Sequence, residues 1–324
     1  MNAGVLTYET IKDWKDQTIF QFKDDLKGLN SFHDQVMRKV MQVAIIKLNK
    51  GVPPCNFSWF VTGSGGRLEQ GFISDQDHGI IYKEDTEESS SYFKALGEEL
   101  SDGLAIVGYP YCKGNIMSSN PLWCKSIDAW RKQLLTWMES ESWEAIRYLQ
   151  IFFDARVLEG KVNYIRRLKS VIYEYQRTNP NLLKRFTANI MHVKNVIGPF
   201  GQLLVERYGI YQGYLDIKYS AFVPYVNATR VLAIKEGVYE TSTLARMYRL
   251  IEKEEYAELL RNCERDFDQL LKYRLSLNKV DCYSDTHFFK IARLGRKEKK
   301  EIKQIVKNGI RLHDEIIELI EKGC

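Results

Sequence analysis

A short β-prone segment that runs directly into a cluster of glycines limits the folds open to this chain. Residues 57–62, FSWFVT, have the aromatic and β-branched composition of a strand. The run Gly63-Ser64-Gly65-Gly66 follows at once, and residues 78–82, HGIIY, predict a second strand. We therefore expect a strand, a glycine turn that opens a short helix, and a second strand at the centre of the first domain.

The pattern along the chain changes near residue 160. We expect helices at 8–50, 86–102, 126–139 and 143–148, and further strands at 104–109 and 151–158. Beyond Gly160 the periodicity is mostly helical, ending in a charged amphipathic helix at 297–322. The fold class predicted is α+β, with a mixed sheet and helices followed by an all-α helical bundle. The predicted divisions are a helical segment at 1–50 that packs on the core, a domain at 51–160, and a helical domain at 161–324.

Composition excludes several classes of protein. The 324 residues are 44% hydrophobic and 27% charged, as in an ordinary soluble globular chain, and the formal net charge is +5. This mild excess favours a nucleotide or an acidic partner but gives neither the basic stripe of a DNA-binding protein nor a stacking platform for nucleic acid. No apolar run reaches the ~20 residues that a membrane span needs, and the N-terminus lacks the pattern of a signal peptide. Six cysteines without a Cys-x-x-Cys pair indicate reduced thiols in a cytoplasmic protein.

The glycine turn has the chemistry of an anion site. Glycines let a backbone approach a ligand closely, and amides at a helix N-terminus attract phosphates. Gly63 and Ser64 would hold such a phosphate, with Ser64 adding its hydroxyl. Arg67 follows about one turn later and could reach a phosphate or pair with a carboxylate.

A pair of carboxylates follows the turn. Asp75 and Asp77 are two residues apart at the expected start of a strand, so alternation places both side chains on one face. Adjacent carboxylates repel each other unless a cation lies between them, and Mg²⁺ prefers such oxygen ligands together with substrate phosphates. A glycine turn alone is usually only a turn, and an Asp-x-Asp pair alone is usually solvated surface. Together, in strand context, they predict metal-assisted phosphoryl or nucleotidyl transfer.

Such chemistry commonly needs a third carboxylate, for which Asp154 is our choice. Asp154 lies in an otherwise apolar segment, where an unpaired charge would be costly. It could instead pair with Arg156, two residues on. Glu69 is the competing candidate, and its alternative role is to brace the turn through Arg67.

These residues resemble a known signature. Gly63-Ser64 followed by Asp75-x-Asp77 is similar to the DNA polymerase β nucleotidyltransferase superfamily. The longer pattern, with Arg67, Glu69 and Ser74, resembles the branch that uridylylates the PII nitrogen-regulatory protein or adenylylates glutamine synthetase. It most resembles a large bacterial family of nucleotidyltransferases of unknown substrate, often fused to cystathionine-β-synthase-type and cyclic-nucleotide-binding-like domains.

The resemblance extends over residues 10 to 320. It includes the central motif at 108–121, GYPYCKGNIMSSNP, the segment at 152–156, and three stretches of the helical half at 213–218, 230–233 and 270–275. Two departures stand out. His78 occupies a position where Asn or a small apolar residue is expected, but alternation turns it away from the aspartates. About fifty residues precede the core, too few for the regulatory domains.

The resemblance implies an Mg²⁺-dependent (or Mn²⁺-dependent) nucleotidyltransferase that uses a nucleoside triphosphate and releases pyrophosphate. The metal would lie on Asp75, Asp77 and Asp154, which are also the catalytic candidates. The residues implied for nucleotide binding are Gly63, Ser64, Arg67, Glu69, Lys113, Asn115, Ser118 and Asn120. The last four lie in a segment that would close the site, or that is simply a capped turn. Lys218 is a weaker candidate, and a plain surface lysine is its alternative reading.

Three functions stay open on this basis. The chain could nucleotidylate a regulatory protein in bacterial signal transduction, as the resembled modifiers do, with the helical half docking the acceptor. It could modify a small molecule instead. It could also be an inactive nucleotide-sensing or interaction module, although the intact aspartates argue against this. Fold-level analogy does not choose between the first two.

Overall fold

The computed structural model describes residues 5–276 and 282–323 and divides the chain into two compact units. The first unit comprises Met1–Ser140 with Ile151–Ile172, and the second comprises Glu141–Gln150 with Tyr173–Cys324. The predicted N-terminal helical segment belongs to the same unit as the sheet. The predicted domain boundaries at residues 50 and 160 stay a prediction.

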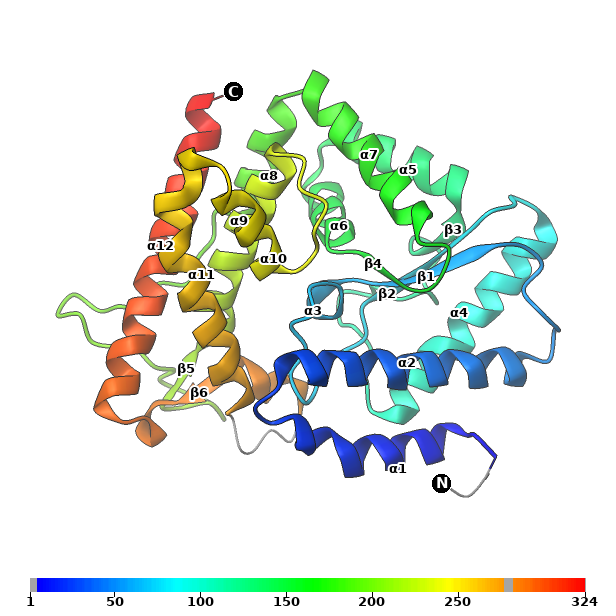
Figure 1. Ribbon diagram of the computed structural model, residues 1–324, viewed down its shortest axis with the longest axis horizontal. Helices are drawn as coiled ribbons and strands as arrows, with labels where there is room; N and C mark the ends of the chain where they lie inside the picture. The colour runs from blue at the N-terminus through cyan, green and yellow to red at the C-terminus, as the bar shows by residue number, and fades with distance from the viewer. Residues whose placement is uncertain (1–4, 277–281, 324) are drawn as a thin grey trace. The chain divides into compact units, whose positions relative to one another are not determined.

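A four-stranded mixed sheet forms the centre of the first unit (Figure 1). Its strands are β1 (Phe57–Val61), β2 (His78–Tyr82), β3 (Cys124–Ser126) and β4 (Arg156–Gly160), in the order β3-β2-β1-β4. β1 pairs antiparallel with β2 and β4, whereas β2 pairs parallel with β3. The two strands predicted around the glycine turn are confirmed, the structure shows that they are direct neighbours in the sheet, and the class is α+β.

Helices surround this sheet. They are α1 (Tyr8–Thr18), the 3₁₀ helix η1 (Ile19–Phe22), α2 (Leu26–Leu48), α3 (Gly63–Gly66), α4 (Glu87–Val107) and α5 (Ile127–Ser140). α6 (Trp143–Phe153) and α7 (Asn163–Thr178) each contribute residues to both units. α1 and α2 lie side by side, and both pack against α4 (Figure 1). A buried cluster of aromatic rings, including Phe60, Trp123, Trp130 and Phe152, fills one side of the core.

Three sequence predictions in this unit are corrected. The helix predicted over residues 8–50 is two helices joined by η1. A second helix begins at Leu26 because the Asp25 side chain is its N-cap and accepts a hydrogen bond from Gly28 N–H. The strand predicted at 104–109 is the end of α4, which stops where Gly108 adopts a φ of 100°. The strand predicted at 151–158 begins only at Arg156, because residues 151–153 finish α6. A short apolar run reads alike as buried helix or buried strand.

The second unit is mainly helical. Its α-helices are α8 (Asn181–Ile190), α9 (Val223–Lys235), α10 (Thr243–Ile251), α11 (Glu254–Leu275) and α12 (Arg296–Gly323). The shorter helices are the π-helix η2 (Lys218–Phe222) and the 3₁₀ helices η3 (Tyr283–His287) and η4 (Ile291–Arg293). An antiparallel ribbon of β5 (Tyr214–Asp216) and β6 (Phe288–Lys290) shows that the expected all-α bundle is not wholly helical.

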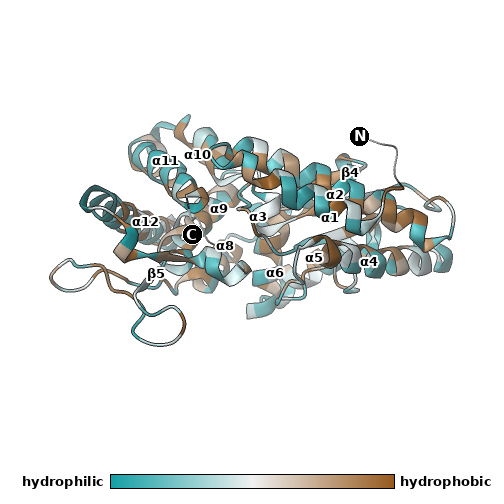
Figure 2. Cartoon of the chain, turned by 90° about the horizontal axis from the view of Figure 1, so that it is seen from below, coloured by the Kyte–Doolittle hydropathy of each residue, from teal (hydrophilic) through white to brown (hydrophobic). Residues whose placement is uncertain are grey.

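The amphipathic helix predicted near the C-terminus is confirmed as α12. It buries Ile305, Leu312 and Ile316 at helical spacing, and Gly309 lies against the ring of Tyr225. Figure 2 shows hydrophilic and hydrophobic residues interspersed along α10, α11 and α12. Within the described residues, no helix has the length and apolar character to cross a membrane.

Candidate functional site

The glycine turn forms α3 directly after β1. Gly66 N–H donates to Thr62 O at 2.8 Å, and Arg67 N–H donates to Gly63 O at 3.1 Å. The amides of Gly63, Ser64 and Gly65 precede the first of these bonds, as at the start of any helix. The turn therefore leaves these three backbone N–H donors outside the hydrogen bonds of the helix, where such groups suit a phosphate oxygen.

The end of α3 is closed by a Schellman cap. Glu69 N–H donates to Ser64 O at 2.9 Å, and Leu68 N–H donates to Gly65 O at 3.3 Å. Leu68 takes a φ of 59°, in the left-handed region where such caps usually have glycine. The cap reverses the chain immediately after the turn and places Arg67 and Glu69 on the buried side.

Two of the three glycines are required by close contacts. A Cβ atom at residue 63, where φ is 54°, would lie 2.2 Å from Asp77 Oδ2. A Cβ atom at residue 66 would lie 2.1 Å from the carbonyl oxygen of Asp154. At Gly65, by contrast, the nearest atom would be 3.5 Å away in Gln70, an ordinary contact. Glycine at residue 63 thus lets the turn approach the Asp77 carboxylate.

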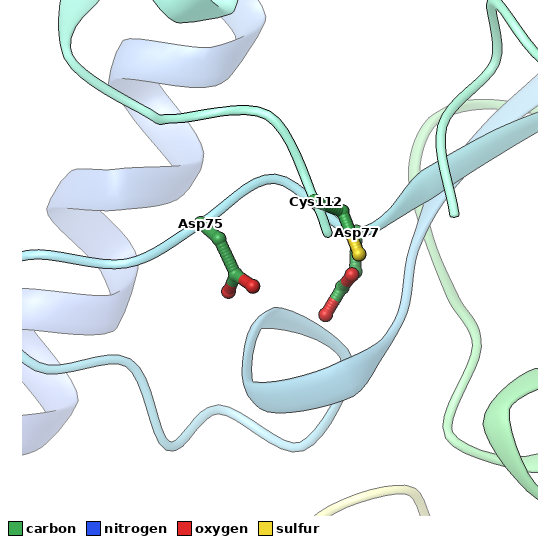
Figure 3. A group of neighbouring side chains, drawn as sticks. All are labelled: Asp75, Asp77 and Cys112. Carbon is green, nitrogen blue, oxygen red and sulfur yellow. The ribbon is translucent and has the colours of Figure 1, made fainter. Parts of the chain in front are cut away.

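Asp75 and Asp77 lie together, as their spacing predicts. They form a group with Cys112 in which one carboxylate oxygen from each aspartate and the cysteine Sγ all lie within 4.8 Å of one another. All three side chains are partly exposed. Both carboxylates point the same way from their segment, and the sulfur lies beside Asp77 (Figure 3). Thr62 N–H fixes the backbone of the pair by donating to Asp77 O at 2.9 Å.

Cys112 is a member of this group that the sequence did not single out as a site residue. Burial, together with the charge of Asp77 and a hydrogen bond to it, raises the pKa of the Cys112 thiol to about 12. The thiol is therefore protonated near neutral pH and donates toward Asp77. Its signal in the sequence is its place within the motif at 108–121.

The donor chemistry of the group fits a divalent cation. Two carboxylates offer the hard oxygen ligands that Mg²⁺ and Mn²⁺ take, with substrate oxygens completing the shell. The sulfur of Cys112 is a softer donor and does not suit Mg²⁺. Asp75 and Asp77 are thus the residues here that would hold such an ion.

A buried ion-pair network lies on the other side of the turn. Arg67 Nε donates to Glu69 Oε2 at 2.7 Å, and Arg67 Nη1 donates to Asp154 Oδ2 at 2.6 Å. Glu69 and Asp154 are 2% and 0% exposed. Burial disfavours the charge on Arg67, but the two carboxylates outweigh burial and raise the pKa of the guanidinium. Of the two roles open to Arg67, the structure displays the pairing with carboxylates.

Comparison with known families is consistent with this geometry. Residues 25–144 match the family described as "Putative nucleotidyltransferase DUF294". Residues 180–317 match the one described as "Putative nucleotidyltransferase substrate binding domain". The two domains are those of a nucleotidyltransferase family. The glycine turn, the aspartate pair and Cys112 all lie within the nucleotidyltransferase domain. No curated protein matches the chain.

The Asp154 carboxylate is paired with Arg67 of the nucleotidyltransferase domain. Among the described residues, the third member of the ligand group is Cys112, and Asp154 is not part of it. Arg156, which the sequence offered as an alternative partner of Asp154, instead forms a bidentate ion pair with Asp34 at 2.6 and 2.8 Å. Arg156 Nε also donates to Gly65 O at 2.9 Å, which ties α3 to β4. Both candidates for the third carboxylate, Asp154 and Glu69, are thus bound to Arg67.

The segment from Lys113 to Asn120 places its polar residues in two ways. Lys113 and Asn115 are exposed, and Asn115 has a left-handed φ of 56°. Ser118 is buried, and its Oγ lies 3.1 Å from His78 Nδ1. Asn120 binds within the segment, since its Nδ2 donates to Asn115 O and its Oδ1 accepts from Leu122 N–H. Ser118 and Asn120 therefore stabilise the segment, and Lys113 and Asn115 are the two exposed residues of the four.

One face of α2 holds the loop that connects the turn to the aspartates. Asn30 Oδ1 accepts from Gln70 N–H at 3.0 Å, and His33 Nε2 donates to Gly71 O at 2.9 Å. His33 Nδ1 accepts from the Tyr109 hydroxyl at 2.8 Å. Burial lowers the pKa of His33 to about 4, so the imidazole is neutral. Sequence reasoning missed these residues of the nucleotidyltransferase domain; the available signal was polar side chains at helical spacing on an apolar face.

Proposed function

We propose that the nucleotidyltransferase domain moves a nucleoside monophosphate from a nucleoside triphosphate to an acceptor hydroxyl and releases pyrophosphate. The acceptor oxygen would form a bond to the α-phosphorus and lose its proton to solvent, while the bond from that phosphorus to the bridging oxygen breaks and its electron pair leaves with pyrophosphate. One observation carries the proposal. Asp75 and Asp77 bring carboxylate oxygens within 4.8 Å of each other beside a turn whose Gly63 is in contact range of Asp77.

The glycine turn would bind the phosphates. The amides of Gly63, Ser64 and Gly65 begin α3 and suit anionic oxygens. Ser64 Oγ lies 3.2 Å from Ser74 Oγ, so its hydroxyl is oriented by a buried neighbour. This arrangement would hold the triphosphate with its α-phosphorus close to the aspartates.

Asp75 and Asp77 would hold Mg²⁺, or Mn²⁺ in its place. When bound, such an ion neutralises charge on the phosphate oxygens and orients them for displacement. The aspartates position the ion, and Thr62 N–H together with the Gly63 contact positions Asp77. Cys112 donates toward Asp77 and limits its movement.

Arg67, Glu69 and Asp154 would act as a brace for the turn. Asp154 contributes twice, through its carboxylate to Arg67 and through its carbonyl oxygen, against which Gly66 packs. We therefore propose that Asp154 supports catalysis by positioning α3, in place of the metal-binding role expected from the sequence. Loss of its carboxylate should weaken activity through movement of the turn.

The position of the label decides the reaction type. Lysate supplemented with the purified chain is incubated with triphosphates labelled at either the α- or the γ-phosphate. Nucleotidyl transfer puts the α-label on the acceptor and leaves the γ-label in pyrophosphate, whereas phosphoryl transfer puts the γ-label on the acceptor and leaves the α-label in the nucleoside diphosphate. Appearance of the γ-label on the acceptor, or transfer of neither label, would contradict the proposal.

The acceptor is proposed to be a protein, by analogy with the resembled modifiers and with the helical second domain as its docking element. The second matched family is described as a substrate-binding domain, which supports recognition of the acceptor by that half of the chain. In the same experiment, α-label in a protein band supports this assignment. Label in a small molecule would identify a small-molecule nucleotidyltransferase, and nucleotide bound without transfer would identify a sensor.

A further inference from the structure

We infer that Gln76, between the two aspartates, is a positioning residue that holds Asp75 and Asp77 on one face, and that His78 locks its side chain. This inference rests on the proposed metal site at the aspartate pair. Neither Gln76 nor His78 would touch the ion or the nucleotide. Their effect would pass through the backbone they share with the aspartates.

The Gln76 side chain is buried and fully engaged. It is 0% exposed, and its Nε2 donates to Ser101 O and to Tyr109 O, both at 3.0 Å. Its Oε1 accepts from His78 Nε2 at 2.9 Å. The amide thus uses both donor hydrogens and an acceptor site, and the side chain has one orientation.

His78 is fixed in turn from its other side. Its Nδ1 accepts from Trp59 Nε1 at 3.3 Å and lies 3.1 Å from Ser118 Oγ, whose single hydrogen is shared between this nitrogen and Gly97 O at 3.3 Å. Both outer donors are fully or almost fully buried. The imidazole therefore has a single tautomer, with the Nε2 hydrogen directed at Gln76.

The backbone of the same segment is also tied down. Gln76 N–H donates to Pro110 O at 3.1 Å, and His78 N–H donates to Ile116 O at 3.0 Å. The side chains of Gln76 and His78 are buried, while Asp75 and Asp77 between and before them are partly exposed. Successive side chains alternate between the two faces of an extended segment. Because Gln76 and His78 are anchored on the buried face, the carboxylates of Asp75 and Asp77 are held in a fixed direction on the opposite face.

Such anchoring matters because the carboxylates repel each other. Two negative charges at this separation favour movement apart when no cation lies between them. A segment held at Gln76 and His78 resists that movement and keeps the pair ready for a cation. Residues that orient ligands in this way typically change metal affinity by roughly 10–100-fold when they are replaced.

The chain offers a matched control for replacement of Gln76. Gln70 is a second buried glutamine in the same connecting loop, 1% exposed. Its backbone N–H binds Asn30, whereas its side-chain Oε1 accepts no hydrogen bond among the described residues. Gln70→Met and Gln76→Met therefore remove the same group from similar burial, and only Gln76→Met removes a link to the aspartate segment.

The experiment measures Mn²⁺ binding to the full chain without nucleotide, from the electron paramagnetic resonance signal of free Mn²⁺. Thermal unfolding confirms that each variant is folded. We expect Gln76→Met to weaken Mn²⁺ binding by roughly 10-fold or more. Gln70→Met should stay within about 3-fold of the wild type, below the effect of an orienting residue. His78→Asn removes the hydrogen-bond donor to Gln76 and should weaken Mn²⁺ binding to an intermediate extent. If Gln76→Met fails to fold, the Mn²⁺ affinity of His78→Asn tests the inference in its place.

A double-variant cycle separates positioning from general loss of structure. In an Asp77→Asn background the repulsion between the carboxylates is gone, so Gln76→Met should have much less effect on the remaining Mn²⁺ affinity. Three results would overturn this inference without affecting the proposed metal site. They are an equal effect of Gln76→Met in both backgrounds, a wild-type Mn²⁺ affinity in Gln76→Met, and a loss of Mn²⁺ affinity in Gln70→Met equal to that in Gln76→Met. No Mn²⁺ binding by the wild type, or binding unaffected by Asp75→Asn with Asp77→Asn, would overturn the proposed metal site as well.

Discussion

Gly63 and Asp77 lie so close that a Cβ atom on residue 63 would stand 2.2 Å from the Asp77 carboxylate oxygen. The glycine turn and the aspartate pair, about a dozen residues apart in the sequence, are therefore one structural unit. Movement of either displaces the other, which makes the contact a direct test of the site.

Gly63→Ala should sharply reduce nucleotidyl transfer. The added methyl group must push Asp77 or the turn aside, and residue 63 has a left-handed φ that alanine adopts poorly. A displacement of about 1 Å at a reacting centre can cost roughly 100-fold in rate. Gly65→Ala is the matched control, because its Cβ makes only ordinary contacts, and it should retain most activity. Initial rates of label transfer check both variants, and similar losses in the two would contradict the account.

Removal of the Arg67 side chain should destabilise the fold strongly. Arg67→Met leaves the buried carboxylates of Glu69 and Asp154 without their shared cation. Breaking a buried pair from one side typically costs about 3–5 kcal/mol. Urea unfolding of Arg67→Met, Asp154→Asn and the double variant measures the coupling. The double variant should lose less than the sum of the singles, and simple additivity would argue against the brace.

Asp154 and Asp77 should differ in what they support. Asp154→Asn should lower the free energy of unfolding, because its carboxylate is buried and pairs with Arg67. It should leave Mn²⁺ affinity nearly unchanged, since Asp154 is outside the ligand group. Asp77→Asn should instead weaken Mn²⁺ binding and should not lower the free energy of unfolding. If Asp154→Asn abolishes Mn²⁺ binding in the folded protein, the metal-ligand role expected from the sequence would be restored.

Acidification should destabilise the chain through His33. Burial lowers its pKa from 6.5 to about 4 in the folded state, so below pH 6.5 the unfolded chain binds a proton that the folded chain does not. Stability present above pH 6.5 is therefore lost as the pH falls toward 4, by up to about 1.4 kcal/mol per pH unit. Urea unfolding at several pH values should show this slope, and His33→Gln should reduce it. An unchanged slope in His33→Gln would mean that His33 is not the cause.

Cys112→Ser should keep Mg²⁺-dependent transfer within a few fold of the wild type. The thiol is a protonated donor toward Asp77 at neutral pH, and a serine hydroxyl can make the same hydrogen bond. Inhibition by Cd²⁺ should weaken in the variant, because a soft ion prefers sulfur. Loss of Mg²⁺-dependent transfer in Cys112→Ser, or undiminished inhibition by Cd²⁺, would contradict this assignment.

The parts of the site that local chemistry determines were predictable from the sequence. Strand, glycine turn and Asp-x-Asp spacing place Asp75 and Asp77 on one face, and the structure confirms that they lie together. The alternation that joins them also turns His78 away from the pair, as predicted. These features depend on neighbours within a few residues, where backbone geometry leaves few alternatives.

The partners that come from elsewhere in the chain were not predictable. Cys112 reaches Asp77 through the fold of the segment after α4, and Asn30 and His33 reach the loop from α2. Asp154 was assigned to a strand because an apolar run can be either helix or strand, and its true partner, Arg67, is 87 residues away. Such long-range contacts follow from tertiary packing, which a local pattern does not encode.

The most direct test of the central claim is α-label transfer by the purified chain with lysate as the source of acceptor. The wild type is compared with Asp75→Asn combined with Asp77→Asn, each with Mg²⁺ and with excess chelator. We expect transfer by the wild type only with Mg²⁺, and none by the variant. The unfolding temperature of the variant should equal or exceed that of the wild type, because the repulsion between the carboxylates is removed. Transfer by the folded variant at the wild-type rate, or transfer that persists in chelator, would contradict the central claim.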